Sequence, residues 1–339
     1  LYAAHILLIP GIILALITVH LMMVWTQKHT QFPGPGRTNT NVVGYPLLPV
    51  YMAKAGGFFF IVFGIIALIG GLVTVNPIWV FGPYTPDQVS AGTQPDWYIG
   101  WLDGALRLMP NWESVIAGFT ISWNVLIPSV VIPGILFTGL ALYPFLEAWA
   151  TGDKREHNLL ERPRNAPVRT GIGVAAIVFY GILWIGGGND VIAAAFSLSF
   201  NVLSWALRIG LIILPPIAFL ITKRICLGLQ RKDREKLLHG YESGRVLRLP
   251  HGEFIEVHQP LNYKELAIIS AKDDILVLPA PVKVDADGVR NPNYRVDQLR
   301  HKLSSFFLRD NIERPTDAEI EAGQAHAAHS AALEAPLHE

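Results

Sequence analysis

Five long runs of apolar residues occupy the first two thirds of the chain. Each run is long enough to cross a membrane as a helix, which takes about 20 residues. Charged segments, or segments rich in proline and glycine, separate the runs and predict the connecting loops. The predicted spans are residues 1–25, 55–76, 114–146, 170–188 and 199–222.

Two of these runs carry features that bend or interrupt helices. The run 114–146 has 33 uncharged residues, so we expect it to tilt, to kink at Pro128 and Pro133, or to protrude from the membrane. Arg208 interrupts the last run, and Pro215 and Pro216 predict a bend there. Because a charge is costly in lipid, Arg208 should face a partner helix or reach outward to water. Its role in a site stays open.

The charged residues are distributed unevenly between the loops. Loops 26–54 and 147–169 and the segment after residue 222 are basic, whereas loop 77–113 is mainly acidic. Cytoplasmic loops of membrane proteins carry an excess of Lys and Arg. We therefore expect the basic segments and the C-terminus to be cytoplasmic, and the loops 77–113 and 186–198 to be external.

Residues 237–339 have a different pattern. The segments 246–250 and 253–258 flank His251-Gly252 and predict a β-hairpin. A short apolar run at 275–278 predicts a further strand, and the spacing of apolar residues over 296–307 predicts a helix. The Ala-, Glu- and His-rich segment from Pro315 onward predicts a frayed helix or disorder.

The expected architecture is an all-α transmembrane bundle of five spans with a C-terminal cytoplasmic extension of mixed α/β and disordered character. We divide it into a first helix, residues 1–25, a four-helix membrane region, residues 26–222, and an extension, residues 223–339. The external loop 77–113 belongs to the membrane region.

Composition supports a membrane protein with a polar extension. Hydrophobic residues make up 51% of the chain and charged residues 16%, compared with about 25% charged in soluble domains. The formal net charge is zero, and the basic residues lie in short loops, which argues against a nucleic-acid-binding surface. The single cysteine excludes an internal disulfide framework.

The first run holds two histidines, His5 and His20, in an otherwise apolar sequence. Fifteen helical residues correspond to about four turns plus 60° and a rise of roughly 22 Å, so both imidazoles lie on nearly one face. Imidazole is a common axial ligand of haem iron. The spacing is compatible with two haems stacked across the membrane, and equally with two histidines hydrogen-bonded between helices.

A second group of polar residues, Pro95-Asp96-Trp97-Tyr98, lies in the acidic external loop. A carboxylate shielded from water has a raised pKa and can exchange protons near neutral pH. Aromatic side chains can form the walls of a pocket for an apolar ring. This combination suits a quinol, whose oxidation releases two protons and two electrons. An interfacial aromatic belt with one solvated Asp is the alternative interpretation.

Together these motifs resemble cytochrome b of the quinol:cytochrome c oxidoreductases, the bc1 and b6f complexes. The resemblance rests on the His5–His20 pair, on Pro95-Asp96-Trp97-Tyr98, and on the following Leu106-Arg107-x-x-Pro110-Asn111, in this order along the chain. It covers residues 1–222. The spacing of 15 between the histidines and Pro10 are of the b6 type. The sequence of residues 27–36 and the long tail are most similar to actinobacterial cytochrome b.

The resemblance implies that the chain is a fragment carrying helices D to H of an eight-helix fold, with helix B and its opposing histidines absent. His5 would then bind the iron of the low-potential b-type haem nearer the outside, and His20 the iron of the high-potential b-type haem nearer the cytoplasm. The family's usual Pro-Glu-Trp-Tyr is changed at Asp96, whose carboxylate is one methylene shorter.

The resemblance also implies two quinone sites. Pro95, Asp96, Trp97, Tyr98 and Asp103 would line the quinol-oxidation site, with Asp96 and Tyr98 as its catalytic residues. Asp103 stands where mitochondrial relatives carry Tyr, and its role is open. Lys54, His29 and Trp25 would belong to the quinone-reduction site on the cytoplasmic side. Lys54 matches the lysine of the family's Lys-Asp pair, Trp25 replaces a histidine of bc1 relatives, and His29 is a candidate proton donor. For Lys54 and His29, simple positive-inside charge is the alternative.

The implied activity is that of a quinol–cytochrome-c reductase of the plasma membrane, using quinol, menaquinol by the actinobacterial likeness, and coupling its oxidation to proton translocation. Implied partners are a Rieske iron–sulfur subunit, a dihaem cytochrome c subunit, a second copy of the complex, and a cytochrome c oxidase. Two alternatives are a dihaem anchor of another quinone-linked oxidoreductase and a haem-free membrane scaffold.

Overall fold

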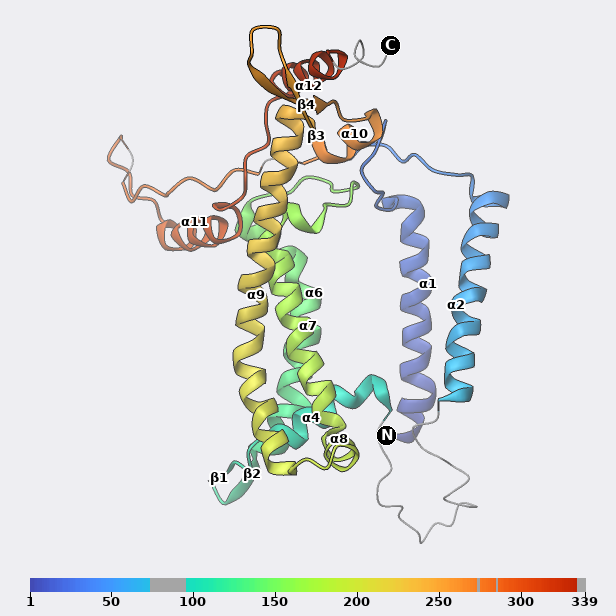
Figure 1. Ribbon diagram of the computed structural model, residues 1–339. Coiled ribbons are helices and arrows are strands. Elements are labelled where there is room, and N and C mark those ends of the chain that lie inside the picture. Colours follow the sequence, from blue (N-terminus) through green and yellow to red (C-terminus); the bar gives the residue numbers. More distant parts are fainter. Residues whose placement is uncertain (74–95, 273–274, 285, 334–339) are drawn as a thin grey trace. The chain divides into compact units, whose positions relative to one another are not determined.

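The computed structural model describes residues 1–73, 96–272, 275–284 and 286–333 of the chain (Figure 1). Five helical segments within these residues are long and apolar enough to cross a membrane. The five predicted spans are therefore confirmed. The observed segments are Ala4–Gln27, Leu47–Leu72, Trp123–Thr151, Pro167–Gly187 and Phe200–His239.

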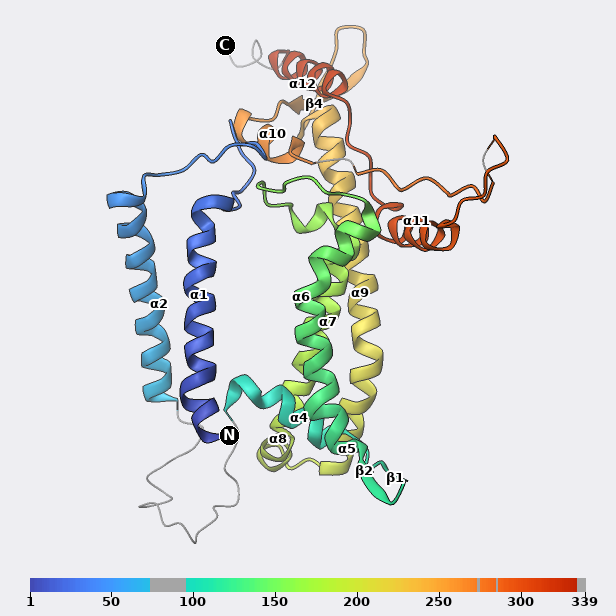
Figure 2. The ribbon, with the colours of Figure 1, turned by 180° about the vertical axis from the view of Figure 1, so that it is seen from behind.

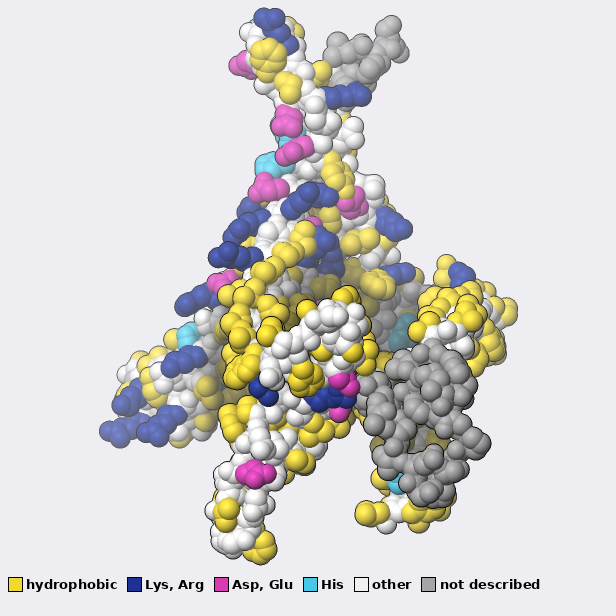
Figure 3. Space-filling model, turned by 60° about the horizontal axis from the view of Figure 1, so that its bottom comes forward, with side chains coloured by type: hydrophobic (Ala, Val, Ile, Leu, Met, Phe, Trp, Pro, Cys, Tyr) yellow, Lys and Arg dark blue, Asp and Glu magenta, His cyan; other side chains and the backbone are white. Residues whose placement is uncertain are grey.

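The chain forms two compact units, which we describe separately. The helical unit comprises Tyr45–Ala150 and Val168–Arg224, and the loop-and-tail unit comprises Leu1–Gly44, Thr151–Pro167 and Ile225–Glu339. Hydrophobic side chains cover much of the helix surface in a space-filling view (Figure 3).

The helical unit is built mainly from helices, of which α6, α7 and the first part of α9 lie side by side (Figures 1 and 2). A hairpin of two short antiparallel strands precedes α5. The elements of this unit are α2 (Met52–Leu72), α4 (Gly100–Leu108), β1 (Glu113–Ile116), β2 (Phe119–Ser122), α5 (Trp123–Leu126), α6 (Ile132–Thr151), α7 (Pro167–Gly187), α8 (Asn189–Ala195) and the first part of α9 (Phe200–His239).

The core of this unit is the contact between α4 and α7. Ala105, Leu108 and Leu183 are buried there, and Trp101 packs edge-on against Tyr180 at a ring distance of 5.3 Å. Gly104 permits the approach, because a Cβ atom at this position would lie 1.7 Å from the carbonyl oxygen of Leu183. Helices with glycine at the interface can bring their backbones together in this way.

Three π-helical turns occur in the described membrane spans, and two of them precede a proline. Residues Ala4–Leu8 form such a turn before Pro10, and Ile127–Val131 form another before Pro133. A proline ring clashes with the carbonyl group four residues earlier in an α-helix, and a π turn holds an extra residue that displaces this carbonyl. The prolines thus leave the helices continuous and widen one turn of each.

Several boundaries differ from the predictions, and two of these differences have a clear physical cause. The third span begins at Trp123, because residues 113–122 turn back on themselves as the β1–β2 hairpin. The tight turn contains Ala117 and Gly118, both with positive φ, which a membrane helix cannot accommodate. The last helix does not end at residue 222 but continues without a break to His239, since the basic residues that follow the apolar run are good helix formers.

The loop-and-tail unit contains the first membrane helix and the folded C-terminal extension. Beyond the second part of α9, its elements are α1 (Ile9–Gln27), β3 (Tyr241–Arg248), β4 (Phe254–Gln259), α10 (Tyr263–Ser270), α11 (Tyr294–Leu308) and α12 (Asp317–Ala332). The predicted hairpin and the predicted helix at 296–307 are confirmed. The predicted strand at 275–278 is wrong, because these residues have no strand partner in the described part of the chain.

The extension has its own small core around α12. Leu237, Leu261, Ile269 and Ile320 are buried together, and Gln324 donates hydrogen bonds to the carbonyl oxygens of Lys236 and Leu237 at the end of α9. A capping box between Thr316 and Glu319 begins α12. The prediction of fraying or disorder after Pro315 is therefore wrong for residues 317–332.

We predict that Gly104→Ala lowers the free energy of unfolding by about 3 kcal/mol, because its methyl group forces α4 away from α7. Thermal denaturation of the detergent-purified protein measures this change. Gly64→Ala in α2 is the matched control, since its Cβ atom meets nothing within 4 Å. Equal melting temperatures for the two variants would contradict the proposed backbone contact.

Candidate functional site

His5 and His20 lie on one continuous helical segment, His5 in the π-helical turn and His20 in α1. No residue of this segment is buried. Neither imidazole has a hydrogen-bond partner among the described residues. The π-helical turn that contains His5 is wider than an α-helical turn and rotates less per residue. It therefore reduces the angular offset of 60° expected between the two imidazoles on a plain α-helix. Both imidazoles are available to bind an iron atom.

The residues Asp96, Trp97 and Tyr98 form a compact group at the start of the α4 segment. The hydroxyl group of Tyr98 donates a hydrogen bond of 2.7 Å to Oδ2 of Asp96. This bond and the carboxylate charge raise the pKa of the Tyr98 phenol. The rings of Trp97 and Tyr98 meet edge to face at 5.9 Å, and both side chains are exposed. Pro95 lies outside the described residues.

The α7 helix positions this group. Nε1 of Trp184 donates a hydrogen bond of 2.7 Å to the carbonyl oxygen of Trp97. The Trp184 ring also lies against Gly100, where a Cβ atom would be 3.2 Å from the indole. The aromatic pair is thus fixed through its backbone, and its side chains stay free for a ligand.

Asp103 lies on the next turns of α4 but has a different environment. Its Oδ2 is 2.6 Å from Nε of Arg107, an ion pair without ideal hydrogen-bond direction. Nη1 of Arg107 also contacts Oδ1 of Asp190 at 2.6 Å and the buried Asn189 at 3.2 Å. Arg107 therefore neutralises Asp103 and ties α4 to α8.

Arg208 takes a position that the sequence left open. Its Nε donates a hydrogen bond of 2.7 Å to the carbonyl oxygen of Leu108, and its guanidinium lies 5.1 Å from the Trp205 ring. Leu108 is the last residue of α4. A cation at this end satisfies a free carbonyl group and interacts favourably with the helix dipole. Arg208 thus faces a partner helix, which was one of the two predicted alternatives; the other was a side chain that reaches outward to water.

The residues predicted for a quinone-reduction site lie in different units. Lys54 is at the start of α2, exposed, with its amine 4.0 Å above the Tyr45 ring. Trp25 is 78% exposed near the end of α1. Nδ1 of the exposed His29 lies 3.0 Å from the carbonyl oxygen of Thr30.

Gln31 is an important residue that the sequence analysis missed. Its side chain is buried and bonds to the backbone of Thr38, Asn41 and Val43. Its own backbone bonds to Asn158 and Leu160. Gln31 thus organises the loop after His29. No sequence signal marks it, because Gln is common on exposed loops.

Comparisons with known proteins agree with the predicted resemblance. Residues 1–83 match the family model described as cytochrome b (N-terminal)/b6/petB. The chain is 52% identical over 330 residues to the cytochrome bc1 complex cytochrome b subunit of Streptomyces coelicolor, covering 96% of this chain and 60% of that protein. The predicted resemblance to actinobacterial cytochrome b is confirmed.

Two further relatives carry the same name. The proteins of Corynebacterium diphtheriae and Mycobacterium tuberculosis are each 55% identical, over 260 and 261 residues. Each alignment covers 77% of this chain, and 48% and 47% of the two relatives. The chain thus spans about half to three fifths of the length of these relatives.

We predict that Trp184→Phe loosens the Asp96–Tyr98 group without unfolding α7, because it removes one hydrogen bond and retains an aromatic ring. Loss of about 1 kcal/mol corresponds to roughly fivefold faster amide exchange at residues 97–99. Hydrogen–deuterium exchange with mass spectrometry measures it. Trp112→Phe is the control, since the exposed Trp112 side chain has no partner in the described residues; equal exchange in both variants would refute the positioning role.

Proposed function

We propose that this cytochrome b-type chain forms part of a subunit that oxidises a quinol and transfers electrons within a membrane respiratory complex, as a quinol–cytochrome-c reductase. The observation that carries the proposal is the coexistence of two free imidazoles on one membrane helix and of a fixed carboxylate–aromatic group on the α4 segment. The similarity to actinobacterial cytochrome b subunits supports it.

His5 and His20 would each provide one axial ligand to a b-type haem, the low-potential one at His5 and the high-potential one at His20. Bound haem would supply reversible one-electron chemistry. With a helical rise of roughly 22 Å between the histidines, the two irons would lie on opposite sides of the membrane. The exposed surface of α1 leaves room for the macrocycles and for the helix that carries the opposing ligands.

Asp96 would accept a proton from the quinol, next to the wall formed by Trp97 and Tyr98. Tyr98 occupies Oδ2 of this carboxylate, so Oδ1 is the oxygen free to accept. Asp103 is less suited to this step because its Oδ2 is already engaged by Nε of Arg107 at 2.6 Å. We therefore assign Asp103 to the support of the site rather than to proton transfer.

A quinone-reduction site would form on the cytoplasmic side, near His20, with Lys54, His29 and Trp25. Lys54 and His29 carry protons that a reduced quinone must take up. The Lys54 amine rests on an aromatic ring and has no carboxylate partner in the described residues, so its charge remains available to an anionic intermediate of the ligand.

The proposed complex includes a Rieske iron–sulfur subunit that takes the first electron and passes it to a dihaem cytochrome c subunit. The second electron would cross the two haems to the cytoplasmic quinone, which couples the reaction to proton translocation. We further propose menaquinol as substrate, a dimeric complex in the plasma membrane, association with a cytochrome c oxidase, and a cytoplasmic C-terminus, which the basic loops support.

The haem assignment predicts that His5→Ala and His20→Ala each remove a different haem from the full-length protein. A reduced-minus-oxidised spectrum should lose about half of its b-type α-band in each variant, and redox titration should show which potential is missing. His251→Ala in the extension is the control and should retain both haems. A normal spectrum in both helix variants would exclude the assignment, and no α-band in the wild-type protein would favour a haem-free scaffold.

The quinol site predicts that Asp96→Asn slows quinol-dependent cytochrome c reduction at least 100-fold, because the amide cannot accept the proton. Asp96→Glu should retain most of the rate, and haem reduction by dithionite should be unchanged in both. Glu113→Gln, an exposed residue of the external hairpin, is the control. Full quinol oxidation by Asp96→Asn would favour a dihaem anchor of another oxidoreductase.

A further inference from the structure

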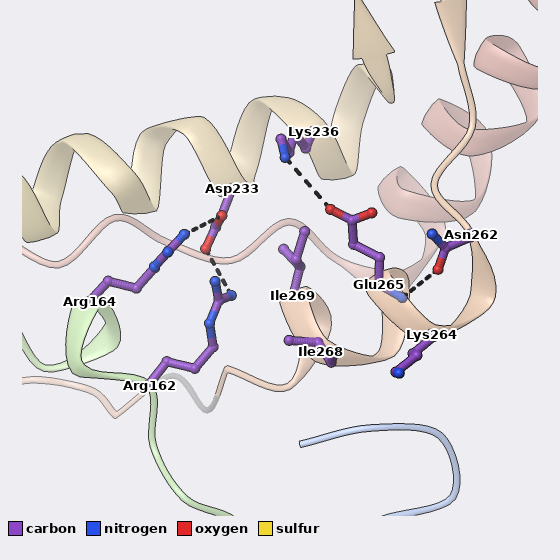
Figure 4. Close-up of a pocket in the computed structure, with 9 residues that line it drawn as sticks. All are labelled: Arg162, Arg164, Asp233, Lys236, Asn262, Lys264, Glu265, Ile268 and Ile269. Carbon is purple, nitrogen blue, oxygen red and sulfur yellow. Dashed lines mark hydrogen bonds and ion pairs between the residues drawn. The ribbon is translucent and has the colours of Figure 1, made fainter. Parts of the chain in front are cut away.

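The loop-and-tail unit contains a charged pocket of about 450 Å³ that none of the functions above uses (Figure 4). A volume of this size accommodates a small organic ligand. Its walls come from the loop before α7, from the end of α9 and from α10. The charged residues that line it are Arg162, Arg164, Asp233, Lys236, Lys264 and Glu265.

The two arginines are arranged around one acceptor. Nη1 of Arg162 contacts Oδ2 of Asp233 at 2.9 Å, and Nη1 of Arg164 contacts Oδ1 at 3.0 Å. The Asp233 side chain is only 12% exposed, so the carboxylate holds both guanidinium groups in place. A guanidinium has five N–H donors, and the remaining donors of both arginines have no acceptor among the described residues.

The opposite wall also has a surplus of positive charge. Lys236 pairs with Glu265 at 3.6 Å, and the Tyr241 hydroxyl donates a hydrogen bond to the same carboxylate. Lys264 has no partner in the part of the chain that the structure describes. Four cationic side chains therefore face two carboxylates, both of which are already engaged, and the pocket keeps a net charge of two positive units.

The floor between these walls is apolar. Ile268 and Ile269 of α10 lie between the arginine pair and the Lys264–Glu265 side (Figure 4). Ile269 is 6% exposed and belongs to the core of the extension. A ligand seated here meets guanidinium and ammonium donors at its ends and aliphatic carbon in its middle.

We propose that this pocket binds a phosphate-bearing anion with at least two negative charges. Arginine forks bind phosphate oxygens in pairs of parallel hydrogen bonds, and the exposed Lys264 adds a third cation. The isoleucines contact the non-phosphate part of the ligand. The site is independent of the haem and quinone assignments.

The source of the phosphate is either a soluble compound or a lipid headgroup, and the length of α9 favours the soluble source. Asp233 comes eleven residues after Thr222, the last residue of the uncharged stretch before Lys223. Eleven helical residues rise about 16 Å, whereas the headgroup layer on one side of a bilayer is about 6 Å thick. The pocket therefore lies beyond the headgroups along the axis of α9.

Calorimetric titration of inorganic pyrophosphate into the full-length, detergent-purified protein at low salt tests the site. Lys264→Gln should weaken binding about fivefold, since it removes one exposed charge and no internal contact. Lys302→Gln is the matched control: Lys302 is an exposed lysine of α11 without a partner in the described residues.

The site is overturned if wild-type protein does not bind pyrophosphate at millimolar concentration, or if Lys264→Gln binds as tightly as Lys302→Gln. When the wild-type protein binds pyrophosphate, the titration is repeated in nanodiscs of cardiolipin and in nanodiscs of phosphatidylcholine. Equal binding in both supports a soluble ligand. Loss of binding only in cardiolipin supports the same pocket filled by a lipid headgroup.

Discussion

The backbone contact between α4 and α7 is the constraint on which the Asp96–Tyr98 group depends. Gly104 lets α4 lie directly on the Leu183 carbonyl, and this places Trp184 within hydrogen-bond distance of Trp97. Arg107 and Arg208 then fix the same short helix at its side and at its end. Each polar contact acts on backbone or on a neighbouring carboxylate, so Asp96, Trp97 and Tyr98 are held without being covered.

The first helix follows a different physical rule. A soluble helix without a buried residue would not be stable alone, but α1 satisfies its backbone hydrogen bonds internally and exposes apolar side chains that lipid accepts. None of its residues is buried, so this helix is stabilised by its own backbone hydrogen bonds and by apolar surroundings for its side chains. The two histidines are the polar exceptions on this apolar surface.

The residue pattern predicted an element well where a single property of the sequence, such as a long apolar run or a turn dipeptide, marks it. Length and hydrophobicity identify the five spans, and the His251-Gly252 turn identifies the hairpin of the extension. The β1–β2 hairpin was missed because residues 114–122 carry no charge and run directly into the apolar helix that follows. The positive φ of Ala117 and Gly118 marks the turn between its strands. Ile275–Leu278 shows the converse error, since an apolar run of four residues also suits an extended segment that lacks a strand partner.

For the candidate site, the sequence motifs name the candidate residues but do not predict how the surroundings of these residues differ. Asp96 and Asp103 are equivalent carboxylates in the sequence, seven positions apart. In space one accepts a neutral hydroxyl group and the other an arginine. Asp103 is therefore engaged by a charged side chain, whereas Oδ1 of Asp96 has no partner among the described residues. The partner that decides this, Arg107, also contacts Asp190 on a segment 83 residues away, and no local pattern encodes such a distance. The different surroundings of the Asp96 and Asp103 carboxylates are therefore set by tertiary contacts and cannot be read from the motif.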